Sequence, residues 1–153
     1  MGEKSFLGTD FVAQIGIIVK DIDKTAQAFA DFFGVDVPPI KWTDEYDKAQ
    51  THYKGNPVES RAKLAFFKME NIQIELIEPD ENPSTWREFL EDHGEGGVHH
   101  IAFIVNGMKQ IVASMENENM PLVQKGGEYD GGRYAYMDSF GQLKVILELL
   151  END

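Results

Sequence analysis

The fold is indicated by two similar segments, VAQIGIIVKDI (12–22) and VHHIAFIVNGM (98–108). Both carry one pattern of branched apolar residues, at two points in the chain. The matched apolar positions are Ile15 with Ile101, Ile18 with Ile104, and Val19 with Val105. A second pair, QIELIEP (73–79) and ILELLEN (146–152), matches in the same order along the chain. Self-similarity of this kind indicates two copies of one structural unit.

Each copy predicts a strand, then a helix, then three strands. The first copy is expected to hold a strand at 11–19, a helix at 21–33 ended by Gly34, an irregular stretch with ragged strands and a mobile loop at 35–59, and strands at 62–68 and 71–78. The second is expected to hold a strand at 98–105, a helix at 108–117, and strands at 120–124, 133–138 and 143–150, with a glycine-rich loop at 126–132. A further short helix is expected at 84–93, between the copies.

The order of these elements favours an α+β fold with mostly antiparallel pairing, because the strands do not alternate regularly with helices. We expect residues 1–153 to form a single domain of two modules, about 10–79 and 97–151, joined by a linker helix at about 84–93. Neither module is expected to be stable alone, and a site is expected between them.

Composition excludes several classes of function. The 153 residues contain no cysteine, so disulfides, thiolate zinc sites, iron–sulfur clusters and a cysteine nucleophile are ruled out. The net charge of −13 argues against nucleic acid as a partner. No apolar run is long enough to cross a membrane, and the first residues do not resemble a signal peptide, so a cytoplasmic protein is expected.

Polar residues recur at equivalent points of the repeat. The first pair of segments places Gln14 where His100 stands, and the second places Glu75 where Glu148 stands. All four lie in otherwise apolar strands, where a buried carboxylate is costly without a partner. An amide oxygen, an imidazole nitrogen and two carboxylate oxygens suit a divalent cation of intermediate hardness. The four residues are therefore candidate metal ligands.

Each candidate also has a structural alternative. Glu75 and Glu148 would face solvent if they lay on the outer side of a sheet, since strand residues alternate in facing. His100 taken singly would be a satisfied structural histidine. Its neighbour His99 is expected to point the opposite way and to be exposed.

The pattern resembles the vicinal oxygen chelate superfamily, also called the glyoxalase/bleomycin resistance/dioxygenase fold, over about residues 10–151. The stretches that carry the resemblance are QIGIIVKDIDKTAQAFADFFG (14–34), IQIELIEP (72–79), GGVHHIAFIV (96–105), YAYMDS (134–139) and LKVILEL (143–149). The resemblance implies two βαβββ modules that pair into a half-barrel cleft. It also implies a divalent metal ion (Co, Mn, Ni, Zn or Mg) held by Gln14, Glu75, His100 and Glu148.

Within the superfamily the chain is most similar to the methylmalonyl-CoA epimerases, through GGVHHI (96–101) and the short helix before it. Those enzymes usually have histidine where this chain has Gln14. The similarity implies a metal-dependent epimerase or isomerase that moves the α-proton of a small carboxylic acyl thioester, with a CoA thioester as a candidate substrate. It also implies a homodimer as the assembly. Glu148 and Glu59 are the two candidates for the proton acceptor and donor. The alternative for Glu59 is a solvated loop residue after Pro57.

The expected substrate contacts are Lys125, Arg133 and Tyr136, which lie around the 126–132 segment; this segment would act either as a lid or as an ordinary hairpin connection. Lys54, Arg61 and Lys63 are further cations for a carboxylate or a CoA phosphate.

Two other functions fit the same resemblance. One is a glyoxalase I-type lactoylglutathione lyase, and the other is a non-catalytic small-molecule binding protein. A ring-cleaving dioxygenase is disfavoured, because its site would need two histidines.

Overall fold

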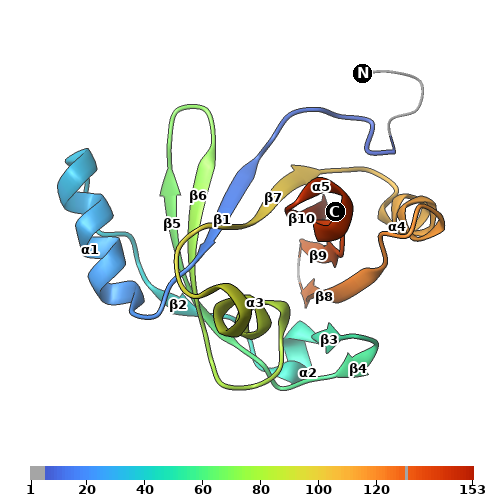
Figure 1. The fold of residues 1–153 in the computed structure, drawn as a ribbon. Helices are drawn as coiled ribbons and strands as arrows, with labels where there is room; N and C mark the ends of the chain where they lie inside the picture. The colour runs from blue at the N-terminus through green and yellow to red at the C-terminus, as the bar shows by residue number, and fades with distance from the viewer. Residues whose placement is uncertain (1–5, 130) are drawn as a thin grey trace.

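The computed structural model describes residues 6–129 and 131–153, and its α+β architecture confirms the predicted fold class (Figure 1). The strands are β1 (Gln14–Ile18), β2 (Lys41–Trp42), β3 (His52–Tyr53), β4 (Asn56–Pro57), β5 (Ala62–Lys68), β6 (Gln73–Pro79), β7 (Val98–Ile104), β8 (Leu122–Tyr129), β9 (Gly132–Met137) and β10 (Ile146–Asn152). The helices are α1 (Ile22–Phe33), α2 (Tyr46–Ala49), α3 (Thr85–His93), α4 (Met108–Asn117) and α5 (Phe140–Leu143). None of the helices in the described ranges is long and apolar enough to span a bilayer.

All the strands join one strongly curled sheet in the order β2-β5-β6-β1-β7-β10-β9-β8-β3-β4. Strands β1 and β7 pair antiparallel at its centre, and each is also parallel to the last strand of its own module, β6 or β10. The order outward from β1 (β6, β5, β2) therefore mirrors the order outward from β7 (β10, β9, β8). This symmetry confirms two βαβββ modules that form a half-barrel.

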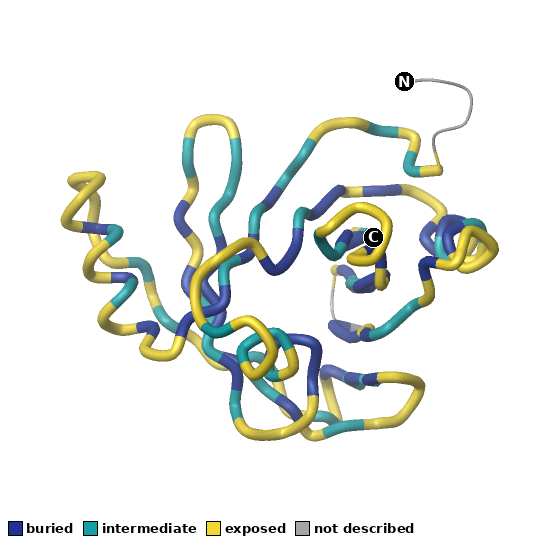
Figure 2. Tube along the Cα trace, viewed as in Figure 1, coloured by how far each residue is buried: buried dark blue, intermediate teal, exposed yellow. Residues whose placement is uncertain are grey.

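Helices α1 and α4 lie on opposite sides of the curled sheet and cover its outer surface (Figure 1). Helix α1 begins at the N-cap Asp21, whose side chain accepts a hydrogen bond from Lys24 N, and ends at Gly34 in the left-handed conformation. Its buried face packs on Ala65, Phe67 and Leu76. Helix α4 packs in the same way on the second module, with Ile111 and Met115 in the core. Figure 2 shows buried stretches alternating with exposed ones along α1 and α4, as expected for helices with one face on a sheet.

Three expectations about the elements are wrong in detail. The loop expected at 126–132 is mostly strand, because β8 continues to Tyr129 and β9 starts at Gly132, with a shift of register between Gly126 and Tyr129. The irregular 35–59 stretch contains the short helix α2, whose C-cap Gln50 is left-handed. The last strand starts at Ile146 rather than 143, because the short helix α5 occupies Phe140–Leu143 and ends at the left-handed Lys144.

Candidate metal centre

The register of the central strands brings the predicted ligands together on the inner surface of the sheet. Gly16 of β1 stands opposite Glu75 of β6 on one side and opposite His100 of β7 on the other. In the neighbouring row Ala102 of β7 stands opposite both Gln14 of β1 and Glu148 of β10. Two adjacent rows of one sheet therefore carry the four polar residues, one from the first and one from the last strand of each module.

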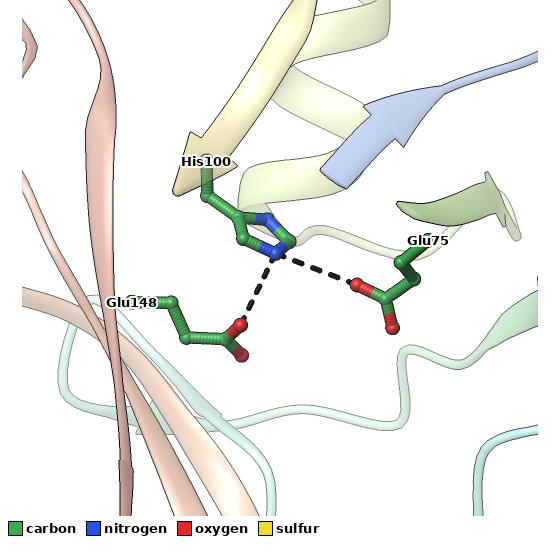
Figure 3. A group of neighbouring side chains, drawn as sticks. All are labelled: Glu75, His100 and Glu148. Carbon is green, nitrogen blue, oxygen red and sulfur yellow. Dashed lines mark ion pairs between the residues drawn. The ribbon is translucent and has the colours of Figure 1, made fainter. Parts of the chain in front are cut away.

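The four side chains converge on the Nε2 atom of His100 (Figure 3 shows three of them). This nitrogen lies 2.9 Å from Gln14 Oε1, 3.1 Å from Glu148 Oε1 and 3.4 Å from Glu75 Oε1. Candidate ligand atoms of Glu75, His100 and Glu148 all lie within 4.8 Å of one another. All four residues are buried, with His100 at 0% exposure and the others at 5–7%. Neither glutamate lies on the solvent side of the sheet.

Gln14 is oriented by a neighbour that the sequence reasoning did not single out. Gln14 Nε2 donates a hydrogen bond to Gln73 Oε1 at 2.6 Å, so its Oε1 atom faces His100. Gln73 lies directly opposite Gln14 in the β1–β6 pair. The strand pairing thus fixes which end of the Gln14 amide faces the site.

Gly16 leaves the space in which the imidazole of His100 lies. A Cβ atom at this position would lie 2.1 Å from His100 Cε1 and 2.5 Å from His100 Nδ1, far inside van der Waals contact. The ring of His100 therefore rests directly on the backbone of β1. The only sequence signal for this role is a glycine in the middle of an apolar strand.

His99 is buried at 1% exposure, so the expectation that it points away from His100 and is exposed is wrong. Gly16 pairs with His100 but Ile17 pairs with Val98, which makes His99 an extra residue in β7, a β-bulge. A bulge interrupts the alternation of facing. The Nδ1 atoms of the two histidines lie 2.9 Å apart.

Burial and mutual charges shift the pKa values of the titratable groups in the site. Burial raises the pKa of Glu75 to about 8, with His100 opposing and Glu148 adding to the shift. For His100, burial alone would lower the pKa, but the negative charges of Glu148, which lies against its Nε2 atom, and of Glu75 outweigh this effect, so its pKa is raised. A proton on this cluster is therefore held more tightly than in the unfolded chain.

The donor set fits a divalent metal ion. Glu75 Oε1 and Glu148 Oε1 are both buried against His100 Nε2, and neither has a hydrogen-bond partner among the residues that the structure describes. Buried carboxylate oxygens without a partner are costly, and a divalent cation would satisfy both and balance their charges. An amide oxygen, an imidazole nitrogen and two carboxylates suit ions between the hard and soft extremes.

A cavity of about 370 Å³ opens onto three of these residues, Gln14, Glu75 and Glu148. Its walls are rich in aromatic side chains, namely Trp42, Phe66, Trp86, Tyr134 and Tyr136. The indole of Trp86 donates to the hydroxyl of Tyr136 at 3.0 Å, which ties helix α3 to strand β9 on the inner face. This volume suits a small organic ligand.

The other predicted site residues lie in different places. Tyr136 lines the cavity beside Glu148, as a substrate contact would. Glu59 is exposed and is not among the residues lining that cavity. Lys125 and Arg133 line a second cavity of about 640 Å³, next to helix α4, and Arg133 is paired with Glu151 and Asp153. Among the described residues that line the cavity at Glu75 and Glu148, the remaining carboxylate is Asp44.

The raised pKa values predict how stability of the chelator-treated protein depends on pH. The folded state holds a proton on Glu75 that the unfolded chain releases above about pH 4.5, so the free energy of unfolding falls as pH rises toward 8. His100 acts in the same direction, because its pKa is raised as well. We expect a loss of at least about 1 kcal/mol between pH 5 and 8 in urea unfolding with EDTA.

The variant Glu75→Gln is the matched control for this pH dependence, since it removes the titrating carboxyl and leaves the other acidic residues in place. Its free energy of unfolding is expected to change less over the same pH range. Equal slopes in the wild type and the variant would show that the decline comes from the net negative charge of the chain instead.

Comparison with known proteins identifies a family and several relatives that this chain resembles. A sequence profile described as the Glyoxalase/Bleomycin resistance protein/Dioxygenase superfamily matches residues 13–136. The uncharacterized protein YqjC of Bacillus subtilis (strain 168) is 30% identical over 95 residues, which are 61% of this chain and 67% of that protein. A mitochondrial methylmalonyl-CoA epimerase of Dictyostelium discoideum is 25% identical over 118 residues, which are 76% of this chain and 62% of that protein.

Among solved structures, a Streptomyces coelicolor methylmalonyl-CoA epimerase variant in complex with 2-nitronate-propionyl-CoA has the same fold. Its TM-score is 0.61 at 21% sequence identity, and the match covers 92% of each chain. At that identity the likeness concerns the fold alone. The profile match over most of the sequence, together with the two-module half-barrel, shows that the chain belongs to the glyoxalase/bleomycin resistance protein/dioxygenase superfamily.

Proposed function

We propose that this protein is a metal-dependent epimerase that moves the α-proton of a small carboxylic acyl thioester, with methylmalonyl-CoA as the substrate to test first. The observation that carries the proposal is the convergence of Gln14, Glu75, His100 and Glu148 beside a cavity of about 370 Å³. The similarity to a methylmalonyl-CoA epimerase in sequence supports the choice of substrate.

Glu75, His100 and Glu148, with the amide oxygen of Gln14, would hold the metal ion. A divalent ion bound there supplies Lewis-acid stabilisation of the negative charge that develops on a carbonyl oxygen of the substrate. This stabilisation is needed because the α-proton of a thioester is far less acidic than a carboxylic acid. The protein's task is then to hold the α-carbon next to proton-transferring groups.

Glu148 and Asp44 are the proposed proton-transferring groups. Epimerisation requires that a proton leave one face of the α-carbon and that another arrive on the opposite face. Glu148 lies on β10 in the second module, while Asp44 follows β2 in the first module, and both line the cavity. Glu148 accepts the proton in one direction of the reaction, and Asp44, which is exposed and can exchange protons with solvent, passes a proton to the other face.

The rim of the cavity offers cations for the anionic parts of such a substrate. The guanidinium of Arg61 and the ammonium of Lys63 lie 5.4 and 5.3 Å from the ring centroid of Trp42, which lines the cavity. Both side chains are about one-third exposed, and each is paired with a carboxylate, Arg61 with Glu45 at 3.8 Å and Lys63 with Glu78 at 3.6 Å. A substrate phosphate or carboxylate at the entrance would compete with these ion pairs.

The decisive experiment is exchange of the C2 proton of methylmalonyl-CoA in D₂O, followed by NMR, with EDTA-treated protein and after addition of Co²⁺. We expect deuterium incorporation and inversion only with the metal. A protein that binds Co²⁺ but exchanges no proton would contradict the epimerase proposal, and a lactoylglutathione product assay would then test the lyase alternative.

In the C2 exchange assay, Asp44→Asn is expected to slow inversion more than Glu59→Gln. The reverse order would assign the second proton-transferring role to Glu59.

The predicted homodimer and the predicted cytoplasmic location remain predictions. Sedimentation velocity of the purified protein tests the first. A mass corresponding to two copies of the 17.3 kDa chain is expected.

A further inference from the structure

We propose that His99 is a positioning residue that holds His100 through a hydrogen bond between the two Nδ1 atoms, so that Nε2 of His100 presents its lone pair to the metal site. This inference rests on the proposed function, because it concerns the same metal site. It assigns a role to a buried polar residue that the ligand set and the cavity leave unexplained.

The β-bulge in strand β7 brings the two adjacent rings to the same side of the sheet. Without the extra residue, His99 and His100 would alternate in facing, and no hydrogen bond between their side chains would be possible. With it, the Nδ1 atoms lie 2.9 Å apart and the two rings meet edge to face, at an interplanar angle of 87°. Bulges often re-aim a side chain beside an active site.

One proton must lie between these two nitrogens, because two lone pairs at this distance would repel. A neutral imidazole carries its proton on one nitrogen only. If Nε2 of His100 is to donate a lone pair to a metal ion, the proton of His100 must stay on Nδ1, and Nδ1 of His99 is the acceptor that keeps it there. Ligating histidines commonly donate their other N–H group to such a partner, which fixes the tautomer and the ring orientation.

The surroundings of His99 hold its ring in a fixed position. The rings of Phe89 from α3 and Tyr136 from β9 contact it edge to face, with centroids 5.5 and 5.2 Å away. Its Nε2 atom is buried, and no hydrogen-bond partner for it lies among residues 6–129 and 131–153. Within that part of the chain, the hydrogen bond of the ring goes to His100.

Three substitutions separate this role from simple packing. His99→Asn places an amide oxygen close to the position of Nδ1, whereas His99→Phe keeps a ring of similar size without a nitrogen, and His99→Gln moves the polar atoms farther out. We expect the affinity for Zn²⁺, measured by calorimetry on folded protein, to fall about 10–100-fold in His99→Phe and His99→Gln. In His99→Asn it is expected to stay within about threefold of the wild type. A packing role would give the opposite order, with His99→Phe closest to the wild type, and would overturn the inference.

Nitrogen NMR of the Zn²⁺-loaded wild type gives a second readout that is independent of activity. A protonated Nδ1 on His100 and an unprotonated Nδ1 on His99 are expected, and the reverse tautomers would overturn the inference. Failure of the proposed function is distinguishable, because it shows in the wild type: no Zn²⁺ binding there contradicts the metal site itself. Wild-type binding with unchanged affinity in His99→Phe contradicts only the role of His99.

Discussion

Replacing Glu148 by glutamine is expected to lower the rate of C2 proton exchange of methylmalonyl-CoA by about 10²–10⁴-fold, even with saturating Co²⁺. The substitution keeps an oxygen in the buried position facing His100, 3.1 Å from its Nε2 atom, so the side chain remains a possible ligand. It removes the carboxylate that accepts the proton, because an amide is not a base at neutral pH. Deuterium incorporation at C2, measured by NMR at several Co²⁺ concentrations, checks this result.

Glu75→Gln is the matched control, because Glu75 is buried to the same degree and faces the same nitrogen from the other module. Its role as proposed is ligation alone, so the variant is expected to need more metal but to recover activity within about tenfold at saturation. If the two variants lose the same activity at saturating Co²⁺, Glu148 acts only as a ligand and the proton acceptor lies elsewhere.

Replacing Gly16 by alanine is expected to displace the imidazole of His100, because the added Cβ atom would lie 2.1 Å from its Cε1 atom. Gly16 lies within a strand and its conformation is open to alanine, so the effect comes from the collision and not from the backbone. Overpacking of this kind costs about 1–3 kcal/mol, which corresponds to a fall of roughly 3–10 °C in Tm for a chain of this size. Affinity for Zn²⁺ is expected to fall by more than about 100-fold, and calorimetry measures it.

The double variant Gly16→Ala/His100→Ala separates this collision from a general defect of strand β1. In the His100→Ala background the alanine at position 16 meets no ring, so its cost in Tm is expected to vanish. A loss of Tm that appears only when His100 is present shows that the two residues contact each other directly. An equal loss of Tm in both backgrounds would show that Gly16 serves the strand and not the histidine.

The convergence of the four polar side chains was predictable from the sequence, since it follows from the repeat. Equivalent positions in two modules related by the symmetry of the sheet must meet at its centre, and Gln14 with His100, and Glu75 with Glu148, occupy such positions. Strand parity alone did not decide whether the glutamates face inward. The packing of α1 and α4 decides it, because Leu76 and Leu149, the sequence neighbours of the two glutamates, lie in the core clusters under these helices.

The details around this centre depend on features that leave weak signals in a sequence. The inward position of His99 needs a one-residue bulge, which shows only once β7 is paired with β1. Lys125 and Arg133 were grouped with Tyr136 because they are close in sequence. Adjacent residues of β9 face opposite surfaces, so Arg133 lies on the α4 side while Tyr136 faces the cavity. Glycines at 126–132 suggested a loop, but they are also compatible with extended and bulged strands.

The antiparallel pairing of β1 with β7 also has a consequence for the timing of folding. His100 and Gln14 are 86 positions apart in the chain, and the site contains residues from both of the modules that this pairing joins. Contacts between distant segments form slowly, because a long loop must close first. A transition state in which only one module is ordered would contain no complete set of ligands. A bound ion would then leave the folding rate nearly unchanged and slow unfolding, so that it prolongs the lifetime of the native chain.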